Sequence, residues 1–428
     1  MVVGVHSGKF TAERVTENIR QAVLRLEVDH PVVNDRHFRI WRAYAVNAWP
    51  TLALIDPDGR HVGSHAGEIT ATLLASTIGA IVADFDSMGK MDRTKLHFQS
   101  EVVSQPRGPL AFPGKVLATG GSRLFVSDSN HNRVLSIRVD GLRGQVEEVI
   151  GGVAAGFADG EFGEAAFHRP QGLALVGDVL YVADTENHAI RAIDLRSGIV
   201  STVAGTGEQS RGMIRGGLGN TTALNSPWDI ISHGGYLYVA MAGSHQIWRL
   251  DLASGEIRLH AGAGYESLAD GPLTGAFLAQ PSGLATDGRY LYFADSESSA
   301  IRWADFGAGG DVRTVVGTGL FDFGDVDGGV DSVRLQHPLG LTWYAGKLYV
   351  ADTYNNKLKV VDPANRTATT FLGTGDAGDR DGDRATFDEP AGVSESQGKL
   401  YIADTNNHKI RVAEIATRSV RSLSIQGI

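Results

Sequence analysis

Apolar residues alternate with small or polar residues along the last three quarters of the chain, in a pattern that recurs six times. Each copy joins a run such as LYVAD to a polar turn and then to a second alternating run such as AIRAID. Alternation with a period of two is typical of strands that bury one face. Such a repeat predicts one structural unit per copy. The copies begin at Leu124, Leu180, Leu237, Leu291, Leu348 and Leu400, between 52 and 57 residues apart.

A proline marks the start of each unit about ten residues before the alternating run, in four units within a Pro-x-Gly segment. In the second unit, the runs GLALVG, LYVAD, AIRAIDL and GIVSTVAG predict four short antiparallel strands. Such a sheet cannot bury both faces alone, whereas copies stacked in a closed ring can. The sequence therefore predicts a mainly β fold, with a six-bladed β-propeller over residues 106–428. The prolines are Pro113, Pro170, Pro227, Pro281, Pro338 and Pro390.

The repeated units resemble NHL repeats. The segment VADTENHAIRAID and its sisters, together with the upstream Pro-x-Gly, carry the resemblance, which covers residues ~105–425. It implies a six-bladed NHL-type β-propeller. Propellers of this kind include protein-binding, RNA-binding and sensing modules and a few lyases or hydrolases, so the resemblance implies a fold rather than one activity.

Residues 1–90 lack the repeat and follow a different pattern. Parallel strands connected by helices and followed by an antiparallel hairpin predict a small α/β domain. The predicted elements are a buried strand VVGVH at 2–6, an amphipathic helix over 11–26, a strand in HPVVND, a helix over 36–45, a hairpin in TLALIDPDGRHVGSHAG and a helix over 69–84. Residues 91–105 are expected to be a linker, in which KLHFQSEVV forms a strand on the edge of the propeller.

The order of these elements, with WPT at 49–51 before the hairpin, resembles the second half of a thioredoxin-like domain. Together with the repeats, VVGVHSGKF, HPVVND and NAWPT make the chain similar to NHL repeat-containing proteins that join such a domain to a propeller. In that fold the proline equivalent to Pro50 is cis and faces a redox site, whose cysteines follow the central strand. This strand and its helix have no counterpart here. We therefore expect an incomplete domain with a natural start upstream of residue 1. VVGVH and TLALID are expected to pair directly, to leave a gap between them or to borrow a strand.

Composition narrows the function classes. The chain has 428 residues, 42% of them apolar and 21% charged, as in folded proteins, and a formal charge of −10. No Lys/Arg-rich run occurs, which disfavours nucleic acid as a partner. The absence of cysteine excludes thiol–disulfide exchange, zinc–cysteine sites and iron–sulfur clusters in this chain. No apolar run is long enough to span a membrane and no export signal is evident, so we expect a cytoplasmic protein without a membrane partner.

Aspartate recurs at one position of five units, at Asp128, Asp184, Asp295, Asp352 and Asp404. A residue needed once for chemistry has no reason to recur in nearly every blade, whereas a hairpin turn needs the same side-chain-to-backbone hydrogen bond each time. We therefore expect these aspartates to be structural. The Asp-Gly pairs at 159–160, 270–271, 327–328 and 381–382 are expected to be turns between blades. The acidic segment DAGDRDGDRATF lacks the glutamate and the spacing of a calcium loop.

Departures from the repeat near each Pro-x-Gly predict the ligand site, because these residues open the innermost strand and face the central channel or its mouth. The third unit departs most, with Asp229 in place of glycine and Met241 in place of aspartate. His168 and His337 belong to opposite blades and are candidates for one metal, but they lack a third ligand in the same register, and we expect no metal or other cofactor. The candidate residues are Lys115, His168, Arg169, Asn225, Trp228, Asp229, Gln280, His337 and Glu389.

Two function classes remain open. The first is a non-redox binding or scaffold protein, in which the channel mouth and the loops of the propeller bind a protein, a peptide or a small ligand. The second is a propeller lyase or hydrolase with its site at the channel mouth, in which His168, His337 and Asp229 act as acid–base or metal-binding residues. Pairing between channel side chains favours the first class, and convergence of the two histidines favours the second.

Overall fold

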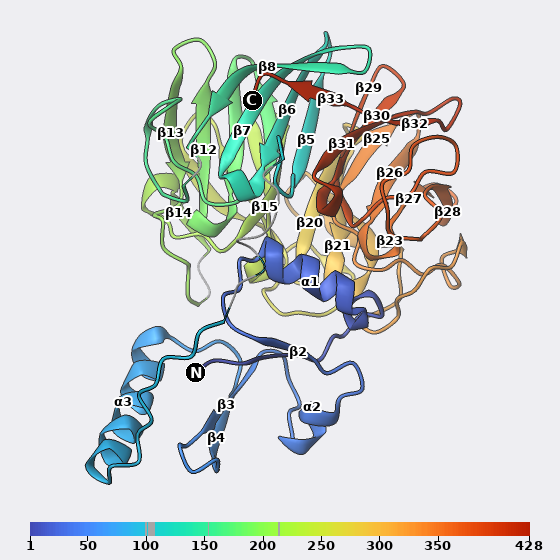
Figure 1. Cartoon of the computed structure of the whole chain (residues 1–428). Helices are drawn as coiled ribbons and strands as arrows, with labels where there is room; N and C mark the ends of the chain where they lie inside the picture. Colours follow the sequence, from blue (N-terminus) through green and yellow to red (C-terminus); the bar gives the residue numbers. More distant parts are fainter. Residues whose placement is uncertain (99–100, 102–107, 153, 213–214) are drawn as a thin grey trace. The chain divides into compact units, whose positions relative to one another are not determined.

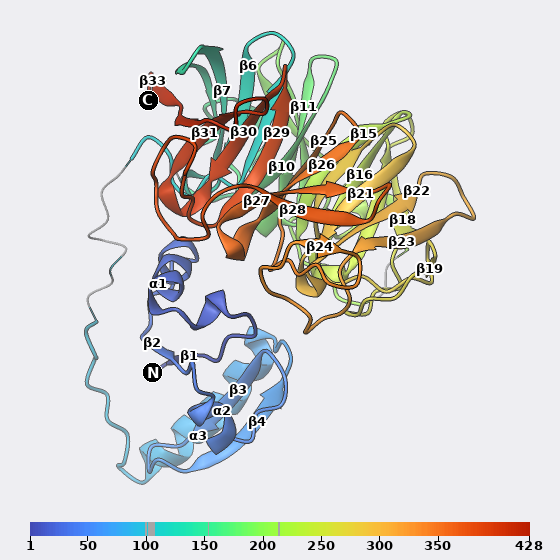
Figure 2. The same cartoon turned by 90° about the vertical axis from the view of Figure 1, so that its right-hand side faces the viewer.

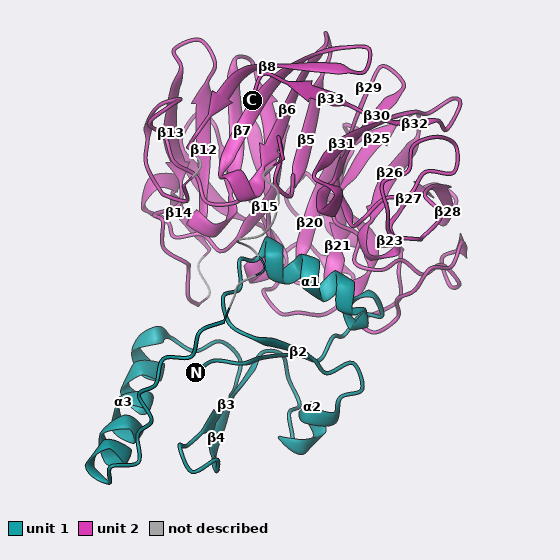
Figure 3. Ribbon diagram, in the orientation of Figure 1, with its two compact units in different colours: residues 1–106 teal, residues 107–428 magenta. Residues whose placement is uncertain are grey.

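Two compact units make up the computed structural model, Met1–Pro106 and Arg107–Ile428 (Figure 3). The described residues are 1–98, 101, 108–152, 154–212 and 215–428. The strand expected in KLHFQSEVV is absent over residues 95–98, and most of the rest of that segment lies outside the described residues. Among the described helices, none is long and apolar enough to cross a membrane.

Unit 1 has the element order that the sequence predicts for an α/β domain (Figure 1). Its helices and strands are β1 (Gly4–His6), α1 (Thr16–Arg25), β2 (Val32–Asn34), α2 (Arg39–Ala43), β3 (Thr51–Ile55), β4 (His61–Ala66) and α3 (Ala71–Ser87), with a 3-10 helix at Ala12–Arg14. β1 and β2 are parallel, and β3 and β4 form an antiparallel hairpin after the cis peptide Trp49–Pro50. The carboxylate of Asp35 stabilises the start of α2, because it accepts hydrogen bonds from the backbone N–H groups of Arg39 and Trp41.

The two strand pairs of unit 1 do not join into one sheet. Among the described residues, β1 pairs only with β2 and β3 only with β4. Large apolar side chains are exposed on this unit, including Val5 of β1 (42%), Leu52 of β3 (40%) and Leu73 of α3 (56%). VVGVH therefore contains a strand, as predicted, but its expected burial is wrong, because Val2, Val3 and Val5 are 64%, 43% and 42% exposed. VVGVH and TLALID do not pair with each other, so direct pairing, one of the three arrangements considered for them, is not formed.

Unit 2 is a six-bladed β-propeller, as the repeat predicts. Each blade has four antiparallel strands, and the innermost strands of neighbouring blades lie next to one another around the centre. Blade 1 contains β5 (Lys115–Thr119), β6 (Arg123–Asp128), β7 (Arg133–Asp140) and β8 (Arg143–Ile150). Blade 2 contains β10 (Pro170–Val176), β11 (Val179–Asp184), β12 (Ala189–Asp194) and β13 (Ile199–Ala204). Blade 3 contains β15 (Pro227–His233), β16 (Tyr236–Met241), β17 (Gln246–Asp251) and β18 (Glu256–Ala261).

The other three blades repeat this arrangement, and Figure 2 shows the strands of blade 6 beside those of blade 1. Blade 4 contains β20 (Pro281–Thr286), β21 (Tyr290–Asp295), β22 (Ala300–Asp305) and β23 (Asp311–Val316). Blade 5 contains β25 (Leu341–Tyr344), β26 (Lys347–Asp352), β27 (Lys357–Asp362) and β28 (Thr367–Leu372). Blade 6 contains β29 (Pro390–Ser396), β30 (Lys399–Asp404), β31 (Lys409–Glu414) and β32 (Val420–Ser422). A 3-10 helix joins the second and third strands of each blade, at Ser129–His131, Thr185–Asn187, Ala242–Ser244, Ser296–Ser298, Thr353–Asn355 and Thr405–Asn407.

Five blades carry a fifth short strand at their outer edge. In blades 2 to 5 this strand comes from the segment before the blade, as β9 (Gly160–Glu161), β14 (Gly216–Leu218), β19 (Gly271–Pro272) and β24 (Gly328–Gly329). The Asp-Gly pairs at 159–160, 270–271 and 327–328 therefore lead into outer strands, and the pair at 381–382 forms a single bridge to Val420, so they are not turns between blades. The reason is that the aspartate side chain accepts a hydrogen bond from the fourth strand of the blade. Asp159, for example, accepts from the backbone N–H of Thr202 at 3.0 Å. In blade 1 the fifth strand is β33 (Ser424–Gln426), which pairs in parallel with β8.

The hydrophobic core of unit 2 lies between its blades. Strands of neighbouring blades pack their apolar faces together, so that Val116 and Leu124 of blade 1 meet Ala403 and Ile410 of blade 6. None of these four side chains is more than 1% exposed. Each blade thus covers the face that its neighbour would otherwise expose to water.

Candidate functional site

Glycine lets the innermost strands approach closely at the centre of the propeller. A Cβ atom on Gly172 of β10 would lie 2.4 Å from Cα of Asp229 on β15, and one on Gly340 would lie 2.1 Å from the carbonyl oxygen of Ala391. A side chain therefore does not fit at either position. Blades 1 and 3 replace this glycine, by Lys115 and Asp229.

Lys115 and Asp229 reach toward each other from the blades on either side of blade 2 and form an ion pair in the channel. Their side chains are 12% and 2% exposed. Asp229 also accepts hydrogen bonds from the backbone N–H groups of Ile230 and Leu284, both at 2.9 Å. Burial raises the pKa of Asp229, and the positive charge of Lys115 opposes that shift. The channel is therefore closed by polar groups that already have partners.

The space that remains in the channel is small. It is lined by residues from all six blades and has room for about one water molecule. The lining residues are Gly114, Lys115, Gln171, Trp228, Asp229, Ser282, Leu339, Gly340 and Ala391. Three of the nine residues that the sequence predicts for the site, Lys115, Trp228 and Asp229, are thus brought together.

A hydrogen bond joins each blade to the next around one end of the channel. The residue before each proline has a left-handed backbone conformation, and its N–H group donates to the side chain that follows the 3-10 helix of the preceding blade. We call these six bonds the ring of latches, and the end of the propeller that they surround the mouth face. They run from Arg169 to Asn132 (2.9 Å), Ser226 to His188 (3.0 Å), Gln280 to His245 (3.2 Å), His337 to Ser299 (3.2 Å), Glu389 to Asn356 (2.9 Å) and Phe112 to His408 (3.0 Å).

Four of the predicted site residues, Arg169, Gln280, His337 and Glu389, occupy latch positions. Their backbone N–H groups are structural, while their side chains differ from blade to blade. Glu389 is buried, and the other three are half-buried. A left-handed conformation is uncommon for residues other than glycine, so the surrounding structure must hold it in place. The latches supply that constraint in every blade.

The recurring aspartates are structural, as expected, and their main role is to fix the loop that leads into the innermost strand. In five blades the carboxylate accepts a hydrogen bond from the N–H group two positions before the proline. Asp184, for example, accepts from His168 at 2.7 Å. Burial raises the pKa of Asp184, whereas hydrogen bonds from Asn187 and Arg191 oppose the shift.

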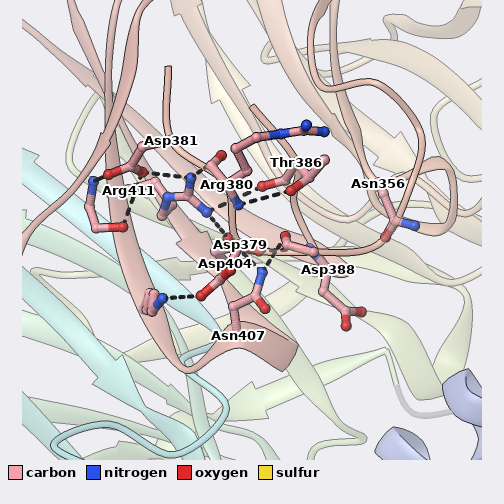
Figure 4. A network of polar contacts seen from close by, with 12 residues as sticks. Asn356, Asp379, Arg380, Asp381, Thr386, Asp388, Asp404, Asn407 and Arg411 are labelled. Carbon is pink, nitrogen blue, oxygen red and sulfur yellow. Dashed lines mark hydrogen bonds and ion pairs between the residues drawn. The ribbon is translucent and has the colours of Figure 1, made fainter. Parts of the chain in front are cut away.

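The sequence reasoning missed a buried cation that bridges two acidic positions in four blades. Arg411 donates to Asp404 and Asp381 at 2.7 and 2.8 Å, and to the carbonyl oxygens of Arg380 and Thr386 in the preceding loop (Figure 4). The side chains at the equivalent position, all 0% exposed, are Arg191, Arg302 and Lys359. Arg191 and Arg302 bridge the same two aspartate positions as Arg411, whereas Lys359 pairs with Asp325 and Asp327. The sequence contains a pattern that indicates these cations: a basic residue stands seven positions after the aspartate in each of these blades.

Two carboxylates of the acidic segment DAGDRDGDRATF form ion pairs within blade 6. Asp381 pairs with Arg411, and Asp379 pairs with Lys409 at 2.5 Å. Within the described part of the chain, no group of three or more histidine, aspartate or glutamate side chains is arranged to hold a metal ion. The carboxylates of this segment therefore contribute to the blade itself.

The two histidines that the sequence singles out lie outside the channel space. Neither His168 nor His337 lines it. The imidazole of His337 stacks on Tyr354, with ring centroids 4.5 Å apart and an angle of 20° between the rings. Its Nδ1 atom lies 3.6 Å from Oε1 of Glu297. His337 therefore belongs to a small half-buried cluster of blades 4 and 5.

Blade 3 lacks the bridging cation. Met241 and Trp248 stand where blades 2, 4, 5 and 6 have the aspartate and the basic residue. The outer strand of blade 3 has Gly216 and Gly217 at the positions of Asp159 and Gly160 in blade 2. Asn225, predicted to face the channel, donates instead to the carbonyl oxygen of Gly243 at 3.1 Å. Asn225 lines a separate pocket at this place in blade 3.

Comparison with known proteins identifies the repeat. The NHL repeat family profile matches residues 167–193, in blade 2. NHL repeat-containing protein 2 of Bos taurus is 41% identical over 98% of this chain and 62% of its own length. Protein SUPPRESSOR OF QUENCHING 1, chloroplastic, of Arabidopsis thaliana is 42% identical over 100% of this chain and 42% of its own length. The chain thus spans less than two thirds of either relative.

Among solved structures, a crystal structure of a nidogen/laminin complex contains a similar chain. The two align over 71% of this chain and 94% of that one, with 16% identical residues and a TM-score of 0.49.

Proposed function

We propose that the chain, which is similar to NHL repeat-containing proteins, acts as a non-redox binding or scaffold protein that presents its mouth face to a protein or peptide partner. The observation that carries this proposal is the buried ion pair between Lys115 and Asp229. It occupies the central channel, where propellers commonly bind small ligands. Room for about one water molecule remains there, so a larger ligand has to contact the outer surface of the mouth face.

The backbone of the mouth face supports this proposal. The ring of latches fixes six equivalent segments, whereas the side chains on them differ, as at Arg169, Gln280 and His337. A fixed backbone loses little conformational entropy on binding. Tyr354, stacked on His337, and the half-buried Trp228 add aromatic groups, which are enriched at protein interfaces.

A lyase or hydrolase at the same place has no specific observation in its favour. Asp229, its candidate acid–base residue, is bonded to Lys115 and to two backbone N–H groups. Releasing the carboxylate for chemistry would leave a buried charge without its partner, at a cost of about 3–5 kcal/mol. The histidines proposed to act with it, His168 and His337, do not line the channel.

Charge reversal on the mouth face tests the binding proposal. Arg169→Glu changes a latch position, whereas Arg196→Glu makes the same change in the β12–β13 hairpin at the opposite end of blade 2, where the Arg196 side chain is 81% exposed. We expect a partner captured from native extract by the wild-type chain to bind the Arg169→Glu chain about tenfold less and the Arg196→Glu chain equally well. Equal capture by all three chains, or equal loss from both variants at unchanged melting temperature, would contradict the proposal.

We also propose that unit 1 is the C-terminal part of a thioredoxin-like domain, because its element order and NAWPT match that resemblance. It would offer an interaction surface without thiol chemistry, since the chain contains no cysteine. A cytoplasmic location without nucleic-acid or membrane partners is a further proposal, and the lack of a Lys/Arg-rich run supports its nucleic-acid part. The name of one relative gives a chloroplast location for that protein. Fractionation of cells that express the tagged chain tests this, and recovery with an organelle or a membrane would contradict it.

A further inference from the structure

Among the described residues, the loop before blade 3 lacks the polar contacts that fasten the corresponding loops of other blades. In blades 2, 5 and 6 an asparagine at the end of the 3-10 helix donates to a loop carbonyl oxygen, as Asn187 does to Gly156 at 2.7 Å. In blades 2, 4 and 6 the bridging arginine adds two more such bonds. Blade 3 has the shorter Ser244 in place of the asparagine and Trp248 in place of the basic residue.

A pocket lies where these contacts are missing. Its inner wall contains Met241 and Trp248, which are 1% and 4% exposed, and its rim contains Ser210, Ser244 and Asn225. The pocket has room for about five water molecules, several times more than the central channel. No charged side chain is among its lining residues. None of its lining residues also lines the channel, so the two spaces are separate.

The wall and the rim of this pocket differ in chemistry. The indole N–H of Trp248 donates to Oε1 of Gln246 at 2.9 Å, so the wall presents an apolar ring and the thioether of Met241. At the rim, the hydroxyl groups of Ser210 and Ser244 make no hydrogen bond to any other described residue. The pocket therefore suits a group that is apolar at its inner end and forms hydrogen bonds at its outer end.

We propose that this pocket binds a branched alkyl group of about four carbon atoms that is attached to one uncharged hydrogen-bonding group. A charged ligand is excluded because burial of a charge without a partner is strongly unfavourable. A leucine side chain with its peptide group and a free branched alcohol share the required chemistry. The site is additional to the mouth face and does not depend on the function proposed for it.

The methionine methyl groups of the full chain report on binding. The chain has five methionines, so labelled methyl groups give a simple spectrum in which Met241 lies at the pocket and Met88 lies in unit 1. The probes are 2-methylpropan-1-ol and the capped peptide N-acetyl-Gly-Leu-Gly-amide. We expect a saturable shift of the Met241 signal and no shift of the Met88 signal. Tighter binding of the peptide would assign the site to a protein segment, and binding of the alcohol alone would assign it to a small molecule.

Two variants test where the probes bind. Ser244→Asn copies the residue that blades 2, 5 and 6 carry at this position, and we expect it to fasten the loop and weaken binding about tenfold. Ser254→Asn makes the same change in the exposed β17–β18 hairpin and should leave binding unchanged. Ser210→Leu fills the rim from the other side and should block binding in the same way. No saturable Met241 shift with either probe, or unchanged affinity in both pocket variants at unchanged melting temperature, would overturn the proposal.

Discussion

The propeller blades and the β3–β4 hairpin of unit 1 contain strands of similar length but bury them to different extents. Val126 in β6 is 0% exposed, because the neighbouring blade packs against it, whereas Leu52 in β3 is 40% exposed. In the propeller every sheet has a neighbour on each side, while the two strand pairs of unit 1 stay separate among the described residues. The comparison teaches that an alternating apolar pattern predicts a strand. Whether that strand is buried depends on whether neighbouring sheets cover it, as they do in a closed ring of blades.

Removal of a large core side chain should show the greatest difference between the two units. Phe387 is fully buried between blades 5 and 6. We expect Phe387→Ala to lower the free energy of unfolding of the propeller by about 4 kcal/mol, because it leaves a cavity. Leu73→Ala, at a 56% exposed position of α3, should cost less than about 0.5 kcal/mol. Denaturant unfolding followed by tryptophan fluorescence measures both, and a similar loss from the two variants would mean that unit 1 has a closed core of its own.

Loss of a bridging cation should have the next largest effect, confined to the propeller. Arg302 is 0% exposed and donates to Asp295 at 2.8 Å. We expect Arg302→Ala to cost about 3 kcal/mol, because it leaves a buried carboxylate without its partner. Arg313→Ala, which removes an exposed ion pair with Asp311 in the same blade, should cost less than about 1 kcal/mol.

A double variant in blade 4 tests whether the apolar pair of blade 3 can replace the buried ion pair. Asp295→Met combined with Arg302→Trp reproduces the pair that Met241 and Trp248 form there. Because both buried charges are removed together, the double variant should unfold with a smaller loss of free energy than Arg302→Ala alone. Thermal melting of the two chains under identical conditions decides the order. A larger loss for the double variant would show that the bridge is essential in blade 4.

Acid should weaken the propeller through the histidines of the ring of latches, with a smaller effect. Nδ1 of His408 accepts the N–H of Phe112, and burial lowers the pKa of His408, which Asp128 and His131 also influence. A lowered pKa means that the stabilisation is fully present above the unfolded value of about 6.5 and is lost as pH falls through the folded value. We expect a loss of about 1 kcal/mol for this latch at low pH.

The variant His408→Asn separates this effect from general acid denaturation. Asparagine occupies the same position in blades 1 and 5, where Asn132 and Asn356 form the latch. The variant should fold and should lose less stability than the wild type between pH 7 and about 5, because an amide does not titrate there. Identical pH profiles of melting temperature for the two chains would contradict the assignment.

The repeat made the propeller predictable, because the same apolar spacing and the same proline occur six times. The structural role of the aspartates was also predictable, since recurrence argues against a unique chemical role. The partner of these aspartates was missed, although Arg191 and its equivalents recur at a fixed distance after them. These basic residues lie in the third strand of each blade. There they look like the polar positions of any strand in which apolar and polar residues alternate.

The channel could be predicted only in part. Lys115 and Asp229 stood out because they replace glycine, and no feature of the sequence alone indicates that side chains from blades 1 and 3 pair with each other. His168, Arg169, Gln280, His337 and Glu389 were chosen for their place beside the proline. At that place the backbone N–H group makes the structural hydrogen bond. Every residue except proline has this group, so the residue type does not show that the bond is formed.

One latch differs from the other five in the length of chain that it closes. Five latches join residues 33 to 38 positions apart, whereas Phe112 and His408 are 296 positions apart. Loop-closure entropy grows with the logarithm of loop length, so this seam costs about 2 kcal/mol more to form than any other latch. β33, which follows His408 in the sequence, also closes the ring, because it pairs with β8 of the first blade. During synthesis, the first blade therefore stays incomplete until the last strand has left the ribosome.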